Sequence, residues 1–112
     1  MAAVYFLIDI TTKCSYNENI MDIEWNADKS ERNLIKHGIS FEEATLVCYD
    51  QTRIETYDAR NDYDEDRWAT IGLVYASVLY VVYTIREAET IRLISARKAN
   101  ANERKQYREA NT

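Results

Sequence analysis

The chain has 112 residues, of which 46% are hydrophobic, and this length is typical of one domain with a modest core. Its formal net charge of −5 argues weakly against a protein whose whole surface binds nucleic acid. One histidine and two distant cysteines exclude a tetrahedral zinc site, and no glycine-rich phosphate loop is present.

The first twenty residues fit poorly into the fold predicted for the rest of the chain. Residues 2–10, "AAVYFLIDI", are apolar but too few to cross a membrane. They also lack the basic start and small-residue cleavage site of a signal peptide, so we expect a cytoplasmic protein. This segment is either an extra strand or an extension that the core does not need, and a start at Met21 would explain it equally well. In a reducing compartment Cys14 and Cys48 are expected to be free thiols, with one intramolecular disulfide as the alternative.

Two helices are predicted after a short strand at residues 22–25. The first follows Asn26, a suitable N-cap, and ends at Gly38. The second covers residues 40–50, where Ser40 precedes Glu43 by three residues, as in a capping box. Its apolar residues make the second helix the better buried of the two.

The second half of the chain is rich in β-branched and aromatic residues. Short links join the later strands as hairpins, and Asn100 with Glu103 predicts the start of a final helix over residues 101–110. The sequence therefore predicts an α+β fold. We expect an antiparallel four-stranded meander with two N-terminal helices and one C-terminal helix, the strands covering residues 52–57, 68–75, 78–85 and 90–95.

Charge is unevenly distributed along the chain. Residues 1–50 carry 4 basic and 9 acidic side chains, residues 51–66 carry 2 and 6, and residues 67–112 carry 8 and 4. The last segment is thus basic, which indicates either an anion-binding face or an ordinary solvated helix surface.

Basic residues lie within and beside the predicted meander: Arg67, Arg86, Arg92, Arg97 and Lys98. Arg92 is the most informative, because strand alternation places it on the face opposite to its apolar neighbours. A buried arginine needs a partner, so that face must meet water or an anion. Guanidinium groups bind phosphate in a bidentate manner, and we expect no metal or other cofactor. The alternative is metal-dependent hydrolysis by the carboxylates of residues 58–66, which no motif supports.

Each candidate also has a structural interpretation. Arg92 could form a solvated cross-strand pair with Glu55 or Glu89. His37 lies at a helix end, where a cationic side chain is favoured by the helix dipole, although it could also carry protons. Glu65 is a potential general base or simply one acid of the acidic loop over residues 58–66.

Three motifs together resemble the BrnT toxins of bacterial type II toxin–antitoxin modules. They are "MDIEWNADKSERNLIKHGISFEEA" (21–44), "EDRWATIG" (65–72) and "IRLISARKANANERKQY" (91–107). The first and last are specific, and the middle one is weaker alone. The resemblance divides the chain into an N-terminal extension, residues 1–20, and a toxin domain, residues 21–112.

The resemblance implies a RelE-like fold and an endoribonuclease that cleaves RNA and inhibits translation. It implies a ribbon-helix-helix antitoxin as partner in a hetero-oligomer, and contact with operator DNA only through that antitoxin. No membrane is involved. The alternatives are a non-catalytic protein that acts with its antitoxin in operon autoregulation, and an RNA-binding module without cleavage.

The resemblance also assigns site residues. Arg97 and Lys98 match the end of a Ser-Ala-Arg motif and are expected to bind RNA. The expected catalytic residues match the other family positions: Arg67, Arg86, Arg92, Glu65, Lys36 and His37.

Overall fold

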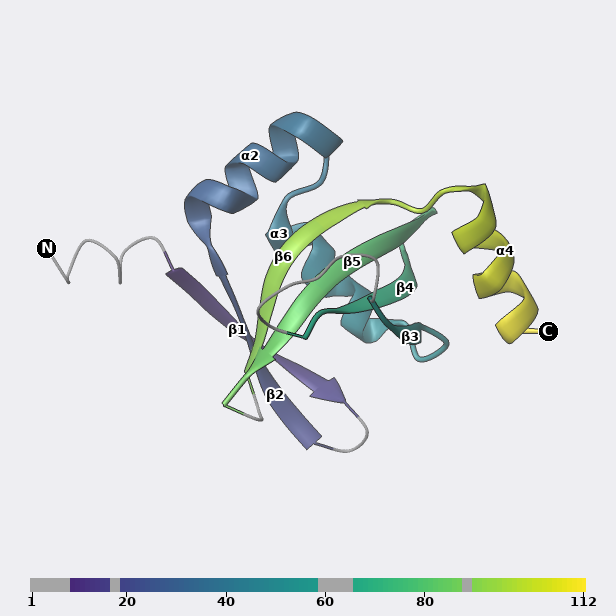
Figure 1. Cartoon of the computed structure of the whole chain (residues 1–112), viewed down its shortest axis with the longest axis horizontal. Coiled ribbons are helices and arrows are strands. Elements are labelled where there is room, and N and C mark those ends of the chain that lie inside the picture. The colour runs from purple at the N-terminus through teal and green to yellow at the C-terminus, as the bar shows by residue number, and fades with distance from the viewer. Residues whose placement is uncertain (1–8, 17–18, 59–65, 88–89) are drawn as a thin grey trace, which may run out of the picture.

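A computed structural model describes residues 9–16, 19–58, 66–87 and 90–112 (Figure 1). The fold is α+β, as predicted, and contains one six-stranded sheet in the order β1-β2-β6-β5-β4-β3. The elements are β1 (Asp9–Tyr16), β2 (Asn19–Asn26), α2 (Ala27–His37), α3 (Phe41–Ala44), the 3-10 helix η1 (Thr45–Tyr49), β3 (Ile54–Tyr57), β4 (Trp68–Val74), β5 (Ser77–Arg86), β6 (Thr90–Lys98) and α4 (Ala101–Ala110).

The sheet is larger than the predicted four strands. Strands β3 to β6 are antiparallel neighbours in chain order, as expected for a meander. In addition, β2 pairs with β6 in parallel, and β1 pairs with β2 in antiparallel orientation. The edge of β6 offers backbone groups that β2 satisfies, which explains why the meander does not stand alone. The division at residue 20 remains a prediction, although residues 9–16 form a strand of this sheet.

Helix α2 begins and ends where the sequence predicts. The Asn26 side chain accepts a hydrogen bond from the Lys29 backbone N–H at 3.1 Å. At the other end Gly38 has φ 77°, and its N–H donates to the Leu34 carbonyl at 2.8 Å. A left-handed residue at this position favours glycine because it has no Cβ.

The predicted second helix is only partly present. The Ser40 hydroxyl accepts from the Glu43 N–H at 3.0 Å and starts α3, but α3 has only four residues and gives way to η1. The change brings Val47 onto the sheet at Gly72, where an added Cβ would lie 2.5 Å from Val47 Cγ2. A regular helix through residue 50 is therefore replaced by a tighter turn that follows the sheet surface.

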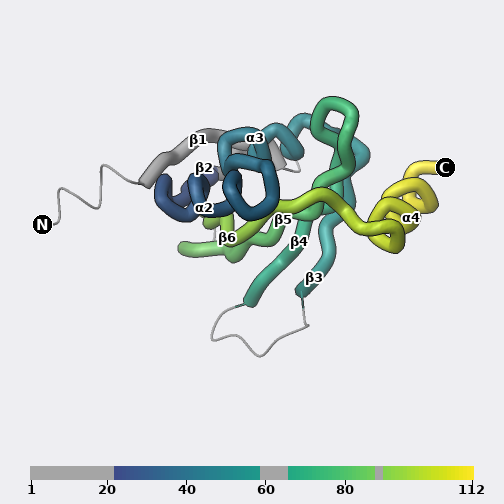
Figure 2. The backbone as a smooth tube through the Cα atoms, turned by 90° about the horizontal axis from the view of Figure 1, so that it is seen from above, coloured from purple at the N-terminus to yellow at the C-terminus, as the bar shows by residue number. Residues whose placement is uncertain are grey.

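The sheet separates two apolar clusters. Helices α2 and α3 with η1 cover one face, which we call the helical face, and Figure 2 shows α2 and α3 grouped there while α4 lies apart at the far end. Trp25 is 3% exposed in the helical-face cluster, as expected for a core tryptophan. The opposite face carries Ile71, Tyr80 and Val82, and Tyr107 of α4 packs against them. Tyr107 thus anchors the last helix to the sheet.

Asn33 ties α2 to the sheet. Its Nδ2 donates to the carbonyls of Ile39 at 2.7 Å and Ala96 at 2.8 Å, and its Oδ1 accepts from the Ala96 N–H at 3.2 Å. Asn33 is 8% exposed, so these bonds form away from water. The buried amide thus fixes both the loop after α2 and strand β6.

The expectation of free thiols is wrong. Cys48 of η1 is disulfide-bonded in the structure. The chain has one other cysteine, Cys14, and it belongs to β1, which runs beside η1. No local sequence pattern indicates this proximity, because it depends on β1 joining the sheet.

Candidate active site

Three neighbouring strands carry one polar row on the face opposite to α2 and α3. In the β2–β6 pairing Glu24 lies beside Arg92, and in the β5–β6 pairing Thr84 lies on the other side of Arg92. Directly paired residues share a face, so the three side chains emerge together. The face is that of the Tyr80–Val82 cluster, since residues two apart on β5 share a face.

Arg67 extends this row onto the start of β4. Trp68 pairs with Tyr83, so the residue before Trp68 lies opposite Thr84. The Thr84 hydroxyl donates to the Asp66 carbonyl at 2.7 Å, and the Asp58 N–H donates to the Arg67 carbonyl at 2.8 Å. These bonds fix the backbone that positions Arg67, whose side chain is half-buried.

Arg86 completes the group from the end of β5. It lies two residues after Thr84 and so shares its face. Its Nη1 is 3.3 Å from Glu24 Oε1, and Arg92 Nη1 is 3.4 Å from the same oxygen. The structure therefore brings Arg67, Arg86 and Arg92 to one side of the sheet. We call this side the arginine face.

Glu24 is the acidic member of the arginine face, and no sequence pattern pointed to it as a site residue. Its side chain is 23% exposed, against 20% for Arg92 and 55% for Arg86. The expected partners of Arg92 were Glu55 and Glu89, but Glu55 lies on the helical face and Glu89 lies outside the described residues. Glu24 was missed because the parallel pairing of β2 with β6 joins segments almost seventy residues apart.

The other candidate residues do not join this group. Lys36 and His37 end α2, which packs on the helical face, so the sheet lies between them and the three arginines. Lys98 is exposed and pairs with Leu79 of the helical face. Glu65 lies outside the described residues. The combination of Lys36 or His37 with the arginines in one reaction centre has no support in this arrangement.

Arg97 lies on the same side of the sheet as Arg92 but is held by α4. Its two terminal nitrogens contact the two Glu103 carboxylate oxygens at 2.7 and 2.8 Å, and its guanidinium lies 4.3 Å from the centre of the Tyr80 ring. Glu103 also closes the capping box with Asn100, as the sequence predicted. Arg97 thus anchors α4 to the sheet.

A second polar cluster lies on the helical face around Glu55. The carboxylate accepts from Tyr83 Oη at 2.6 Å and from Thr70 Oγ1 at 2.7 and 2.8 Å. Burial raises the pKa of Glu55, and the hydrogen bonds together with Arg53 oppose that rise. No motif indicated this cluster, since its members come from three strands. It is separated from the arginine face by the sheet.

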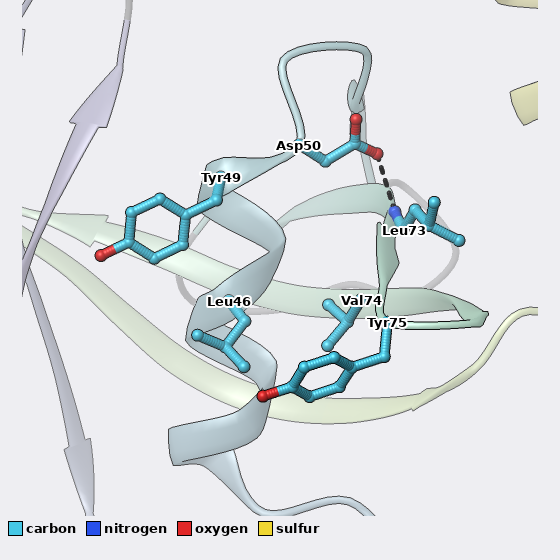
Figure 3. Close-up of a pocket in the computed structure, with 6 residues that line it drawn as sticks. All are labelled: Leu46, Tyr49, Asp50, Leu73, Val74 and Tyr75. Atoms are coloured by element: carbon cyan, nitrogen blue, oxygen red, sulfur yellow. Dashed lines mark hydrogen bonds between the residues drawn. The ribbon is translucent and has the colours of Figure 1, made fainter.

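A cavity of about 390 Å³ opens between η1 and the end of β4 (Figure 3). Tyr49 and Tyr75 at its mouth are 78% and 82% exposed. Asp50, the charged residue of the lining, accepts from the Leu73 N–H at 2.7 Å and from Tyr107 Oη at 2.6 Å. An apolar cavity with a carboxylate does not suit an RNA phosphate, so we do not include it in the candidate active site.

Comparison with known proteins identifies the family. A family model described as "Ribonuclease toxin, BrnT, of type II toxin-antitoxin system" matches residues 25–103, which is more than half of the chain. The chain belongs to the BrnT family. Among solved structures it is similar to the BrnT ribonuclease toxin of Brucella abortus, with 20% identity, a TM-score of 0.48, and coverage of 68% of this chain and 92% of that chain. No curated protein matches.

The region matched to BrnT contains the three arginines of the arginine face, begins directly after Glu24 and ends at Glu103. Membership makes this chain a ribonuclease toxin of a type II toxin–antitoxin system, which has an antitoxin as partner. Within the described ranges no helix is long and apolar enough to cross a membrane. In the same part of the chain, no three His, Cys, Asp or Glu side chains gather to hold a metal ion.

Proposed function

We propose that this BrnT-family protein is an endoribonuclease that cleaves single-stranded RNA at the arginine face without a metal and thereby inhibits translation. The observation that carries the proposal is the placement of Arg67, Arg86 and Arg92 on one side of the sheet. A ribonuclease needs positive charge around the scissile phosphate, and this side supplies it from three separate chain segments.

The chemistry needs little beyond that charge. RNA carries its own nucleophile, the 2′-hydroxyl, and its attack builds negative charge on the phosphate oxygens. Preorganised guanidinium groups stabilise such charge, and removal of one donor typically lowers the rate about 10²–10³-fold. The backbone bonds at Asp66 and Arg67 and the pairing of β5 with β6 hold the arginines in place before RNA binds.

The partners follow from the same assignment. The antitoxin is a ribbon-helix-helix protein that forms a hetero-oligomer with this chain in the cytoplasm, and the complex reaches operator DNA through the antitoxin. The acidic net charge of −5 fits this division, because it disfavours direct contact of the toxin with DNA.

A second candidate function is non-catalytic operon autoregulation with the antitoxin. One observation favours it: Glu24 already contacts two of the three arginines, at 3.3 and 3.4 Å, so their charge is partly balanced without RNA. The two functions differ in whether RNA is cut.

The test is cleavage of a labelled single-stranded RNA by the purified protein in EDTA. We expect cleavage by the wild type and a loss of about 100-fold or more in Arg92→Ala and in Arg67→Ala. Arg32→Ala is the matched control, because Arg32 is an exposed arginine of α2 and should leave the rate unchanged. An intact RNA with the wild type would reject the nuclease and favour autoregulation. Full cleavage by Arg92→Ala would reject the site.

A further inference from the structure

The structure assigns a base to the reaction, and this assignment rests on the proposed function. We propose that the Glu24 carboxylate accepts the proton of the attacking 2′-hydroxyl. Among the described residues of the arginine face, Glu24 contacts both Arg86 and Arg92. A phosphate held by those two guanidiniums would lie directly beside this carboxylate.

The contacts of Glu24 are unlike those of a structural ion pair in the same chain. Arg97 and Glu103 form a bidentate pair at 2.7 and 2.8 Å, the range typical of tight charge-assisted bonds. Glu24 instead contacts its arginines at 3.3 and 3.4 Å, and both contacts use Oε1. This looser arrangement lets the arginines turn toward a phosphate while the carboxylate stays next to it. We assign proton transfer to Oε2.

The geometry around Glu24 suits a proton acceptor. A carboxylate accepts but cannot donate hydrogen bonds, and guanidinium nitrogens of Arg86 and Arg92 lie beside this one. Glu24 is 23% exposed, so RNA can reach it. Its position is rigid, because strand β2 is paired with β6 at Asp22, Ile23 and Glu24.

Glu24 takes the proton from the 2′-hydroxyl, and the 2′-oxygen forms a bond to phosphorus. The bond from phosphorus to the 5′-oxygen breaks, and the leaving oxygen takes a proton from water. The hydroxide that remains is neutralised by the proton on Glu24. The products are a 2′,3′-cyclic phosphate and a 5′-hydroxyl.

Asp22 provides a matched control for the test. It lies two residues before Glu24 on the same face of β2, and its strand partner Thr90 lies opposite Arg86. Asp22→Asn therefore removes one negative charge from the same face of β2, two residues away from Glu24. Glu24→Gln removes the base and keeps the shape, whereas Glu24→Asp keeps a carboxylate.

The experiment compares single-turnover cleavage with binding to the same RNA carrying 2′-O-methyl groups, which cannot be cleaved. Glu24→Gln should cleave 100-fold or more slowly, a typical effect of losing a general base, yet bind the methylated RNA at least as tightly as wild type. Glu24→Asp should cleave faster than Glu24→Gln, and Asp22→Asn should cleave within threefold of wild type.

Three results would overturn the assignment. Cleavage by Glu24→Gln within threefold of wild type would show that Glu24 is not the base. A parallel loss of binding and cleavage would show that it only arranges the arginines. An equal loss in Asp22→Asn would indicate a general charge effect. In all three the wild type still cuts RNA and Arg92→Ala does not, so the proposed function stands; a wild type that fails to cut would remove both.

Discussion

Asn33 makes three hydrogen bonds that join α2, the loop after it and β6. Its replacement should lower the free energy of unfolding more than replacement of any exposed residue of α2. In Asn33→Ala the Ile39 carbonyl and both backbone groups of Ala96 lose their partner. Each net hydrogen bond contributes about 1 kcal/mol, and a buried group left without a partner costs about 1–3 kcal/mol. We therefore expect the free energy of unfolding to fall by about 3–5 kcal/mol.

The assay is urea unfolding followed by tryptophan fluorescence, since Trp25 is buried near this junction. A loss of that size corresponds to a melting temperature lower by roughly 12–20 °C for a chain of this length. Ile35→Ala is the control: Ile35 is 80% exposed on the same helix and should change stability by less than about 0.5 kcal/mol. A loss below about 1 kcal/mol in Asn33→Ala would refute the reasoning that these bonds are buried and irreplaceable.

Three further predictions concern packing, pH and the last helix. Gly72→Ala should lower the free energy of unfolding by about 1–3 kcal/mol, because the new Cβ would lie 2.5 Å from Val47 Cγ2. Asp50→Asn should lower the free energy of unfolding at neutral pH by about 1 kcal/mol, and the difference from wild type should shrink below about pH 4. Burial raises the pKa of Asp50, but the hydrogen bonds to its carboxylate outweigh burial, so the pKa is lowered overall. Since the folded pKa is lowered, the stabilisation exists above the unfolded value and is lost as the pH falls. Arg97→Lys should cost about 1 kcal/mol, because lysine cannot keep the bidentate pair with Glu103, while RNA cleavage stays within threefold.

Thermal unfolding checks the first and third of these, and a pH series of unfolding curves checks the second. An unchanged melting temperature in Gly72→Ala would mean that η1 can move away from β4 at little cost. A difference between wild type and Asp50→Asn that stays constant to pH 3 would contradict the lowered pKa. A large fall in RNA cleavage by a well-folded Arg97→Lys protein would show that Arg97 takes part in RNA binding, as the resemblance to the family implies.

The local parts of the fold were predictable because their causes are local. Asn26 and Gly38 set the ends of α2 through a side-chain cap and a left-handed residue, and both effects depend on a few neighbouring positions. The capping box of α4 is local in the same way. The meander also followed from strands joined by short links, which favour antiparallel neighbours.

The remaining features depend on distant pairing. The parallel contact of β2 with β6, the addition of β1 and the bonding of Cys48 all require segments far apart in the chain to meet. The same applies to the break between α3 and η1, where Val47 follows the surface created by Gly72. No periodicity within one segment carries that information.

For the candidate site too, strand patterns predicted some placements, whereas motif membership alone did not. Alternation on β6 placed Arg92 on the polar face. The meander brought Arg86 and Arg67 to it, because Arg86 belongs to the neighbouring antiparallel strand and Arg67 directly precedes the next one. Lys36 and His37 were grouped with them by motif membership, yet α2 packs on the other face. A motif shared within a family thus mixes residues of the helical face with residues that line the proposed RNA-binding face.

The pairing of β2 with β6 links the two halves of the reaction as we propose it. Strand β6 supplies Arg92 to stabilise charge, and β2 supplies Glu24 to receive the proton, at adjacent positions of one parallel ladder. In this proposal the antiparallel strands provide the binding surface, and the parallel strand from the N-terminal part of the chain provides the base that turns binding into cleavage.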